Sequence, residues 1–197
     1  YGIFPMIMGS IYVTLGALAI GVSVGLLSAI YLSRFCSDKV HKKLKPAVDL
    51  LAGIPSVVYG FFGLVVIVPF VRQNFGGSGA SILAASILLG IMILPTIISV
   101  SEAALRAVPN SYYEGALALG ATHERSVFFA VLPAATSGIV AGIILGFGRA
   151  IGETMAVILV AGNQARMPTG ILGGVRTLTA NIVLEMGYAT DLHREAL

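Results

Sequence analysis

The sequence contains few charged residues, a single cysteine and no tryptophan. Charged side chains make up 11% of its 197 residues and hydrophobic ones 57%, and the mean hydropathy is +0.95. A soluble domain carries roughly 25% charged residues, so this composition excludes a soluble globular domain and indicates a membrane protein. Cys36 has no second cysteine to pair with and no Cys or His cluster beside it, so we expect no disulfide, no metal site and no cofactor.

The residues that nucleotide binding or hydrolysis needs are also missing. No lysine follows Lys45, and no glycine-rich turn followed by Lys and Ser or Thr occurs, which is the usual phosphate loop. The histidines fall in expected loops and no paired aspartates lie in an apolar run, which argues against an intramembrane hydrolase. We therefore predict that the chain is not an enzyme and that any ATP hydrolysis belongs to a partner.

Four charge-free runs divide the chain. They cover residues 1–33, 50–71, 73–101 and 126–148, and the last resumes to Val160 beyond Arg149 and Glu153. Because a spanning helix needs roughly 20 apolar residues, we predict one all-α transmembrane domain over residues 1–197, with spans at about 9–33, 52–71, 80–101 and 134–162. The chain begins at Tyr1 rather than Met and ends in a polar stretch, so we expect it to be a piece of a longer protein that lacks helices at both ends.

The loops between these runs carry unequal positive charge. The segment after the first run contains Arg34 and all of the lysines, against two aspartates, so the positive-inside tendency places it in the cytoplasm. Counting onward places the loop at about residues 102–130 in the cytoplasm and the segment at about 163–197 outside. The net charge of +3 does not indicate nucleic acid, because lysines beside a membrane favour contact with anionic membrane lipid.

Within residues 102–130, local signals predict a short helix outside the membrane. Ser111 and Glu114 have the spacing of a capping box, and Gly120 stands where a left-handed residue closes a helix. A helix this short is marginal in water, so its own membrane helices or a groove in another subunit must hold it. The apolar side chains available for that contact are Tyr112, Tyr113, Leu117 and Leu119.

Arg149 and Glu153 interrupt the fourth apolar run. In a helix from near Ala135 to near Gly162, their spacing places them on one face, close to the middle of the helix. A lone charge at that depth costs roughly 2.5–3.5 kcal/mol on insertion scales, so we expect the two to pair. One interpretation is a structural ion pair. The other is an anion pathway, in which the Arg149 guanidinium binds phosphate oxygens and Glu153 holds Arg149 when no ion is present.

Small residues and proline-associated polar residues add weaker signals. Gly138, Gly142 and Gly146 recur every four residues, which favours close packing of one membrane helix against another. The polar side chains near prolines have two interpretations, since they either line a pathway or, more commonly, satisfy backbone carbonyls freed by the proline. They are Ser56, Tyr59 and Thr96.

The stretch "EGALALGATHERSVFFAVLP" resembles the EAA loop of ABC-transporter permeases of the MetI-like superfamily. Its matching positions are Glu114, Ala116, Gly120, Leu132 and Pro133, while Gly115 stands where the family most often has Ala. The resemblance implies a coupling helix that docks in a cleft of an ATPase subunit and transmits its closing motion. These residues would then contact the ATPase and form the turn that ends the helix, and they would have no catalytic role.

Three longer segments resemble the phosphate permease family PstC more than its partner family PstA. They are "ILGFGRAIGETMAVILVAGN", "RTLTANIVLEMG" and "YGIFPMIMGSIYVTLGALAIGVSVGLLSAIYLSRF". The resemblance implies an ABC importer of inorganic phosphate in a prokaryotic inner membrane, with a MetI-like helical bundle of which this chain lacks both ends. It also implies as partners a PstA-like second permease, an ATPase dimer and a periplasmic phosphate-binding protein. The outer segment that receives the last partner would include Arg166, Arg176, Glu185 and Asp191.

Two other functions remain open. A permease of the same superfamily for sulfate, molybdate or another solute would share the EAA-like loop, and only the Arg149 and Glu153 segment and the outer motifs favour phosphate over it. A stand-alone ion channel would leave the predicted coupling helix without a purpose.

Overall fold

The computed structural model describes residues 2–197, and these residues form two compact units. The first unit contains residues 2–20, Ile54–Met92 and Gly148–Leu197. The second unit contains Gly21–Gly53 and Ile93–Phe147. Three helices contribute residues to both units: α1 (Phe4–Ile30), α5 (Ile82–Ala107) and α9 (Thr136–Gly152).

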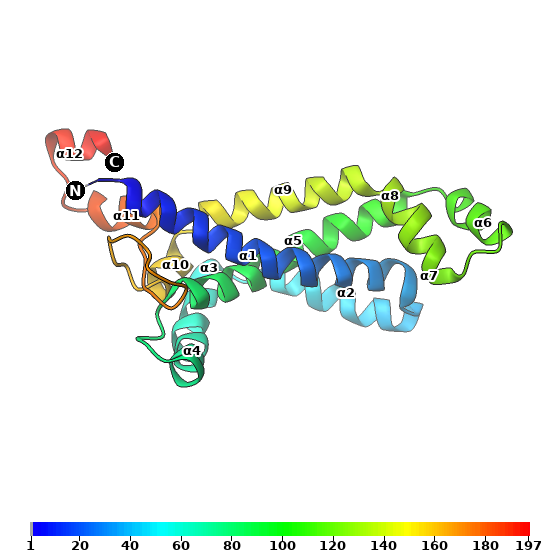
Figure 1. Cartoon of the computed structure of the whole chain (residues 1–197), viewed down its shortest axis with the longest axis horizontal. Helices are drawn as coiled ribbons and strands as arrows, with labels where there is room; N and C mark the ends of the chain where they lie inside the picture. The colour runs from blue at the N-terminus through cyan, green and yellow to red at the C-terminus, as the bar shows by residue number, and fades with distance from the viewer. Residues whose placement is uncertain (1) are drawn as a thin grey trace. The chain divides into compact units, whose positions relative to one another are not determined.

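Helices account for all of the regular structure in the described residues, as Figure 1 shows. The shorter helices are α2 (Asp38–Ala52), α3 (Ser56–Phe62), α4 (Val68–Phe75), α6 (Asn110–Ala118), α7 (His123–Ser126), α8 (Leu132–Ala134), α10 (Met155–Val160), α11 (Leu178–Met186) and α12 (Asp191–Ala196). Three π-helical turns, η1 (Tyr31–Phe35), η2 (Gly63–Ile67) and η3 (Val127–Val131), continue α1, α3 and α7. No strand occurs within residues 2–197, only an isolated bridge between Gly162 and Val175. The predicted all-α fold class is confirmed.

Three helical stretches in this part of the chain are long and apolar enough to cross a membrane: Phe4–Phe35, Ser56–Phe75 and Ile82–Ala107. A fourth results if His123–Ala134 and Thr136–Gly152 are counted as one span with a 70° bend. The polytopic character predicted from the charge-free runs is therefore present in the structure.

The predicted unbroken helix from Ala135 to Gly162 is wrong. α9 ends at Gly152, and Thr154, with φ −123° and ψ −58°, lies outside the helical region before α10 begins. The Glu153 carboxylate accepts hydrogen bonds from the backbone amides of Thr154 and Ala156. A side chain that binds backbone amides in this way competes with the helical hydrogen bonds, so the helix breaks beside Glu153.

The lysine-rich segment after η1 is the helix α2 rather than the loop expected from its charge. His41 and Lys45 lie one turn apart on the face of α2 that meets α5. On α5, Glu102 and Ser99 provide their partners, with Lys45 Nζ donating to Ser99 Oγ at 2.8 Å. The charged side chains are thus satisfied by a helix that is distant in the sequence.

In the second unit, α9 packs closely against α5 through its glycines. A Cβ atom at Gly142 would lie 3.2 Å from Val100 Cβ, and one at Gly146 would lie 3.0 Å from Ile97 Cγ1. Gly138 faces Ala104 still more closely. The close packing predicted from the four-residue glycine repeat is confirmed. The apolar cluster beside it consists of Ala29, Ile30, Leu105, Val108, Val127, Val131, Ala135 and Ile139.

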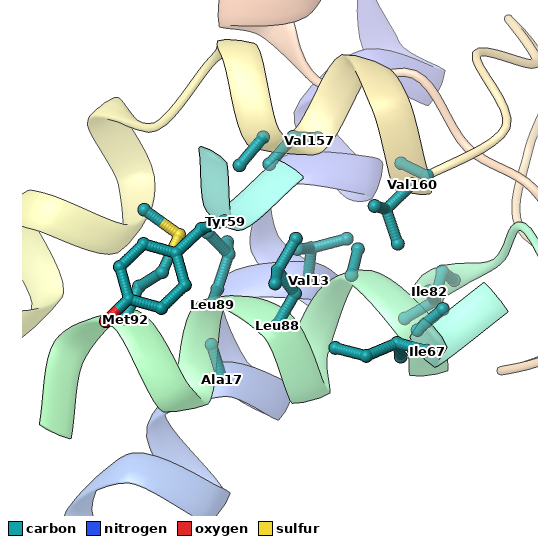
Figure 2. Close-up of a cluster of buried hydrophobic side chains, with 14 of the residues drawn as sticks. Val13, Ala17, Tyr59, Ile67, Ile82, Leu88, Leu89, Met92, Val157 and Val160 are labelled. Carbon is teal, nitrogen blue, oxygen red and sulfur yellow. The ribbon is translucent and has the colours of Figure 1, made fainter. Parts of the chain in front are cut away.

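The core of the first unit lies where α3 and η2 meet α10, the start of α5 and the first half of α1. Figure 2 shows Tyr59 inside this cluster, together with Leu88, Leu89 and Val160. Tyr59 is only 5% exposed, so it is surrounded by apolar side chains and not by a water-filled path. The loop before α11 caps α5, because the carbonyls of Gly173 and Ile171 accept from the amides of Ile82 and Leu83, which have no partner within the helix.

Candidate functional site

The break between α9 and α10 contains both charged residues of the fourth apolar run. Glu153 Oε1 accepts from the amides of Thr154 at 3.1 Å and Ala156 at 3.2 Å. The Glu153 carbonyl accepts from Thr179 Oγ1 at 3.0 Å. The first amides of a helix have no intrahelical acceptor and carry partial positive charge, so a carboxylate is a favourable cap for α10.

Arg149 and Glu153 do not form the expected ion pair. Within the described residues, the carboxylate of Glu153 is held by backbone amides instead. Because α9 ends between the two residues, their four-residue spacing no longer places them on one helical face. Arg149 is half-buried in the last turn of α9.

Three polar side chains from two other elements of the first unit lie around the capped break. Ser10 and Thr14 come from α1, and Thr177 caps α11 through its side-chain oxygen. Together with Glu153 they line a cavity of about 10 Å³. That is room for about one water molecule, so this cavity is too small for a tetrahedral oxyanion in the conformation described.

The short helix predicted in the 102–130 loop is present as α6, but its start differs from the expectation. α6 follows Pro109 directly, so Ser111 is already inside the helix, and no side chain caps its first turn. The capping box of Ser111 and Glu114 is therefore not formed. The predicted end is confirmed, since Gly120 has φ +87° and its amide donates to the Leu117 carbonyl at 2.9 Å.

α6 separates its apolar side chains into two groups. Tyr113 is half-buried, packs against the apolar cluster of the second unit, and its hydroxyl lies 2.8 Å from His123 Nδ1. Tyr112, Leu117 and Leu119 are exposed, and Leu119 is 91% exposed. Of the four side chains expected to hold the helix, Tyr113 is the one that packs against the apolar cluster within the described residues.

The remaining residues of the EAA-like loop lie along the same part of the second unit. Glu114 and Gly115 are exposed on α6, and Ala116 is half-buried. Leu132 is half-buried against the apolar cluster, and the exposed Pro133 stands in the first turn of α8. The loop therefore leaves from α5, presents α6 and returns toward α9 at Leu132.

The structure contains a buried charge cluster that was not predicted from the sequence. Glu102 in α5 is 3% exposed, and it accepts from Arg106 Nε at 2.9 Å and His41 Nε2 at 2.6 Å. Lys45 Nζ lies 3.4 Å from its second oxygen. The only signal in the sequence is that two pairs, Glu102 with Arg106 and His41 with Lys45, each have the four-residue helical spacing.

Two arginines join the ends of η1 and α5. Arg34 Nη2 donates to the Leu105 carbonyl at 2.7 Å, and Arg106 Nη2 donates to the Leu32 carbonyl at 3.0 Å. Carbonyls in the last turn of a helix lack an intrahelical donor, so each arginine donates a hydrogen bond that such a carbonyl of the other helix needs. With Glu102, these contacts bind α1, α2 and α5 together next to the start of the EAA-like loop.

In the outer segment, two residues expected to face a partner bind each other. Arg176 Nη1 donates to Glu185 Oε1 at 2.8 Å and also contacts Asn181 Oδ1 at 3.2 Å. The Tyr188 hydroxyl, and then Arg176, lower the pKa of Glu185 by stabilising its carboxylate. Arg166 and Asp191 remain exposed.

Residues 3–190 match the protein family described as the binding-protein-dependent transport system inner membrane component. The chain therefore belongs to this family, and the predicted membership of the ABC permease superfamily and the multi-pass inner-membrane location are confirmed. The chain is 42% identical to the probable ABC transporter permease protein YqgH of Bacillus subtilis, over 96% of this chain and 62% of that protein. It is 36% identical to the phosphate transport system permease protein PstC of Xylella fastidiosa, over 100% of this chain and 67% of that protein. The chain thus spans 62% to 67% of the length of these curated relatives.

Solved structures show the same fold. A chain of the MetNI methionine ABC transporter in inward-facing conformations superposes with a TM-score of 0.68 at 22% identity, covering 99% of this chain and 83% of that one. A chain of an amino acid ABC transporter with histidines gives a TM-score of 0.63 at 21% identity, covering 97% and 80%. The predicted MetI-like helical bundle is confirmed by the family match together with these two likenesses.

Proposed function

We propose that this chain acts in the permease subunit of an ATP-driven ABC importer, and that the imported solute is inorganic phosphate. The observation that carries the proposal is α6, a helix of nine residues without a buried residue, on which Leu117 and Leu119 are exposed. Isolated helices of this length are marginal in water. In a family of binding-protein-dependent transport components, its exposed Leu117 and Leu119 suit a cleft on an ATPase subunit.

Each residue of the loop has a separate part in this proposal. Glu114 and Gly115 form the exposed surface of α6 that contacts the ATPase, and Ala116 lets the helix lie close to its own chain. Gly120 makes the left-handed turn that ends the helix. Leu132 and Pro133 begin the return to α9, so movement of α6 reaches a membrane helix at that point.

The proposal of phosphate rests on the relatives named PstC and on the position of Arg149. Glu153 caps α10, so it does not neutralise Arg149, whose positive charge can attract an anion. A guanidinium presents a planar fork of donors that matches two phosphate oxygens, which favours Arg over Lys for this task. Glu153 then has a structural part, because it maintains the break in the helix beside Arg149.

The proposed partners follow from this function. A periplasmic phosphate-binding protein delivers the ion to the outer segment, where Arg166 and Asp191 are exposed. A PstA-like second permease forms the other half of the pathway. An ATPase dimer closes on ATP, and α6 transmits that closure in an alternating-access cycle. Anionic membrane lipid contacts the exposed lysines of α2, Lys39, Lys42 and Lys43, on the cytoplasmic side.

Uptake measurements test this function. The full-length protein is reconstituted in vesicles with its second permease, ATPase and binding protein, and ATP-dependent uptake of labelled phosphate is measured with excess unlabelled phosphate, sulfate or molybdate. We expect only unlabelled phosphate to compete. Arg149→Ala should lower uptake by more than about tenfold, the loss of one charge-assisted contact, while Arg72→Ala, which removes an exposed arginine of α4, should not.

Other outcomes point to the other functions. Competition by sulfate or molybdate would retain the permease and reject phosphate as its solute, and the relative YqgH is named without a solute. Phosphate flux that does not need ATP would favour a stand-alone channel. Normal uptake by an assembled Arg149→Ala complex would remove Arg149 from the pathway.

A further inference from the structure

α6 belongs to the second unit and packs against η3 and α7, and Tyr113 provides one of its contacts. No residue of α6 is fully buried, and only Tyr113 and Ala116 are half-buried. The Tyr113 ring packs against the apolar cluster of the second unit, and its hydroxyl lies 2.8 Å from His123 Nδ1. Tyr113 therefore gives force applied to α6 one path into the rest of the unit. Figure 1 shows α6 beside α7, the helix that His123 begins.

His123 stands between Tyr113 and the end of the first membrane helix. Its ring meets the Tyr113 ring edge-on, with centroids 5.6 Å apart at 78°. On its other side it meets Phe35, the last residue of η1, with centroids 4.8 Å apart at 74°. Edge-to-face packing at these separations is the favoured arrangement of aromatic rings. Three rings thus connect α6, through α7, to the end of η1.

The end of η1 is itself joined firmly to α5. Next to Phe35, Arg34 donates to the Leu105 carbonyl at 2.7 Å, and Arg106 of α5 donates to the Leu32 carbonyl at 3.0 Å. Both hydrogen bonds link backbone to a charged side chain, which is the stronger kind. A displacement of Phe35 is therefore shared by η1 and α5.

We propose that His123 is a positioning residue through which α6 moves η1 and α5, by way of the Tyr113 hydroxyl on one side and Phe35 on the other. This rests on the proposed function, because it assigns to His123 a step in the transmission from the ATPase. It adds a second route to the one along the chain, which runs from α6 to α9 through Leu132. The two routes together move helices on both sides of the loop.

Deleting single hydroxyl groups tests the link. Tyr113→Phe keeps the ring in the apolar cluster and removes only the group that meets His123. Tyr112→Phe is the matched control, since it removes a hydroxyl from the neighbouring tyrosine, which is 54% exposed. The readout is the number of ATP molecules hydrolysed per phosphate ion imported by the reconstituted complex. A typical hydrogen bond shifts an equilibrium about fivefold, so we expect Tyr113→Phe to raise this ratio about fivefold and Tyr112→Phe to leave it unchanged.

A double-mutant cycle and a rescue separate transmission from general damage. His123→Ala should raise the ratio as well, and adding Tyr113→Phe to it should raise the ratio no further, because both changes remove the same contact. His123→Asn retains an amide near the position of Nδ1 and should restore much of the coupling. Retention of the ATPase by each variant is checked by co-purification.

The outcomes distinguish this inference from the proposed function. If the wild-type complex imports nothing with ATP, the proposed function fails. If the wild type is coupled and Tyr113→Phe behaves like Tyr112→Phe, only the role of His123 fails. Loss of the ATPase from Tyr113→Phe would also overturn it, because the contact would then serve docking rather than transmission.

Discussion

Replacing Glu102 by glutamine removes the charge at the centre of the cluster that joins α2 to α5. Glu102 is 3% exposed and accepts from Arg106 Nε at 2.9 Å and from His41 Nε2 at 2.6 Å, with Lys45 Nζ at 3.4 Å. Glutamine has nearly the same size and keeps one acceptor oxygen, but it turns an NH₂ group toward cations. The substitution therefore tests the charge with little change in packing.

The expected loss lies between that of a buried ion pair and that of a surface pair. Removing one member of a fully buried pair costs about 3–5 kcal/mol, whereas an exposed pair contributes about 0–1 kcal/mol. Here the acid is buried, but the side chains of Arg106, His41 and Lys45 are 48%, 25% and 26% exposed and regain hydration once the acid is neutral. We expect the free energy of unfolding to fall by about 2–3 kcal/mol, which corresponds to a lowering of the unfolding midpoint by roughly 4–12 °C.

The assay is thermal unfolding of the purified full-length protein in detergent micelles, followed by the loss of helical circular dichroism. Glu114→Gln is the matched control, because it makes the same change at an exposed carboxylate of α6 and should alter the stability by less than about 0.5 kcal/mol. A midpoint for Glu102→Gln that falls no further than that of Glu114→Gln would refute the assignment of a stabilising charge cluster.

Two further substitutions test the packing of α9 and the outer segment. Gly142→Val should cost about 1–3 kcal/mol by overpacking against α5, while Gly148→Val, at a glycine with no atom within 4 Å of an added Cβ, should cost much less; equal unfolding midpoints for the two variants would contradict the packing. The pKa of Glu185 lies below its ordinary value of 4.5, because Tyr188 and Arg176 stabilise the carboxylate, so the stability that it provides is present above pH 4.5 and is lost as the pH falls through the lower, folded-state pKa. The protection of residues 163–190 against hydrogen exchange, relative to the intrinsic rate at each pH, should therefore fall more on acidification in the wild type than in Glu185→Gln, and identical protection profiles would contradict this.

Features that depend on neighbouring residues were predictable. Charge-free runs identify the spans because each spanning helix must present apolar side chains of its own to the hydrocarbon of the membrane. Gly120 ends α6 because the left-handed backbone conformation at this position favours glycine, whatever its surroundings. The repeat of Gly138, Gly142 and Gly146 predicts close helix packing, although it does not say that α5 is the helix opposite.

Local rules failed where two local possibilities compete. Glu153 has the spacing to pair with Arg149 along a helix and also the chemistry to cap the amides that follow it, and in the structure it does the second. Ser111 and Glu114 match a capping box, but α6 begins at Asn110, directly after Pro109, so Ser111 already lies inside the helix. Sequence patterns name both alternatives without giving the difference in free energy between them.

Contacts between distant segments depend on how the helices pack. His41 and Glu102 are 61 positions apart, and their contact joins α2 to α5 at a carboxylate that is buried at the end of an apolar run. Phe35, Tyr113 and His123 likewise meet only because η1 ends beside α7. Hydropathy and helical spacing depend on residues that are close together in the sequence, so the sequence alone determines them. The pairing of charges and rings depends on distances in space, which are set only when the helices have packed.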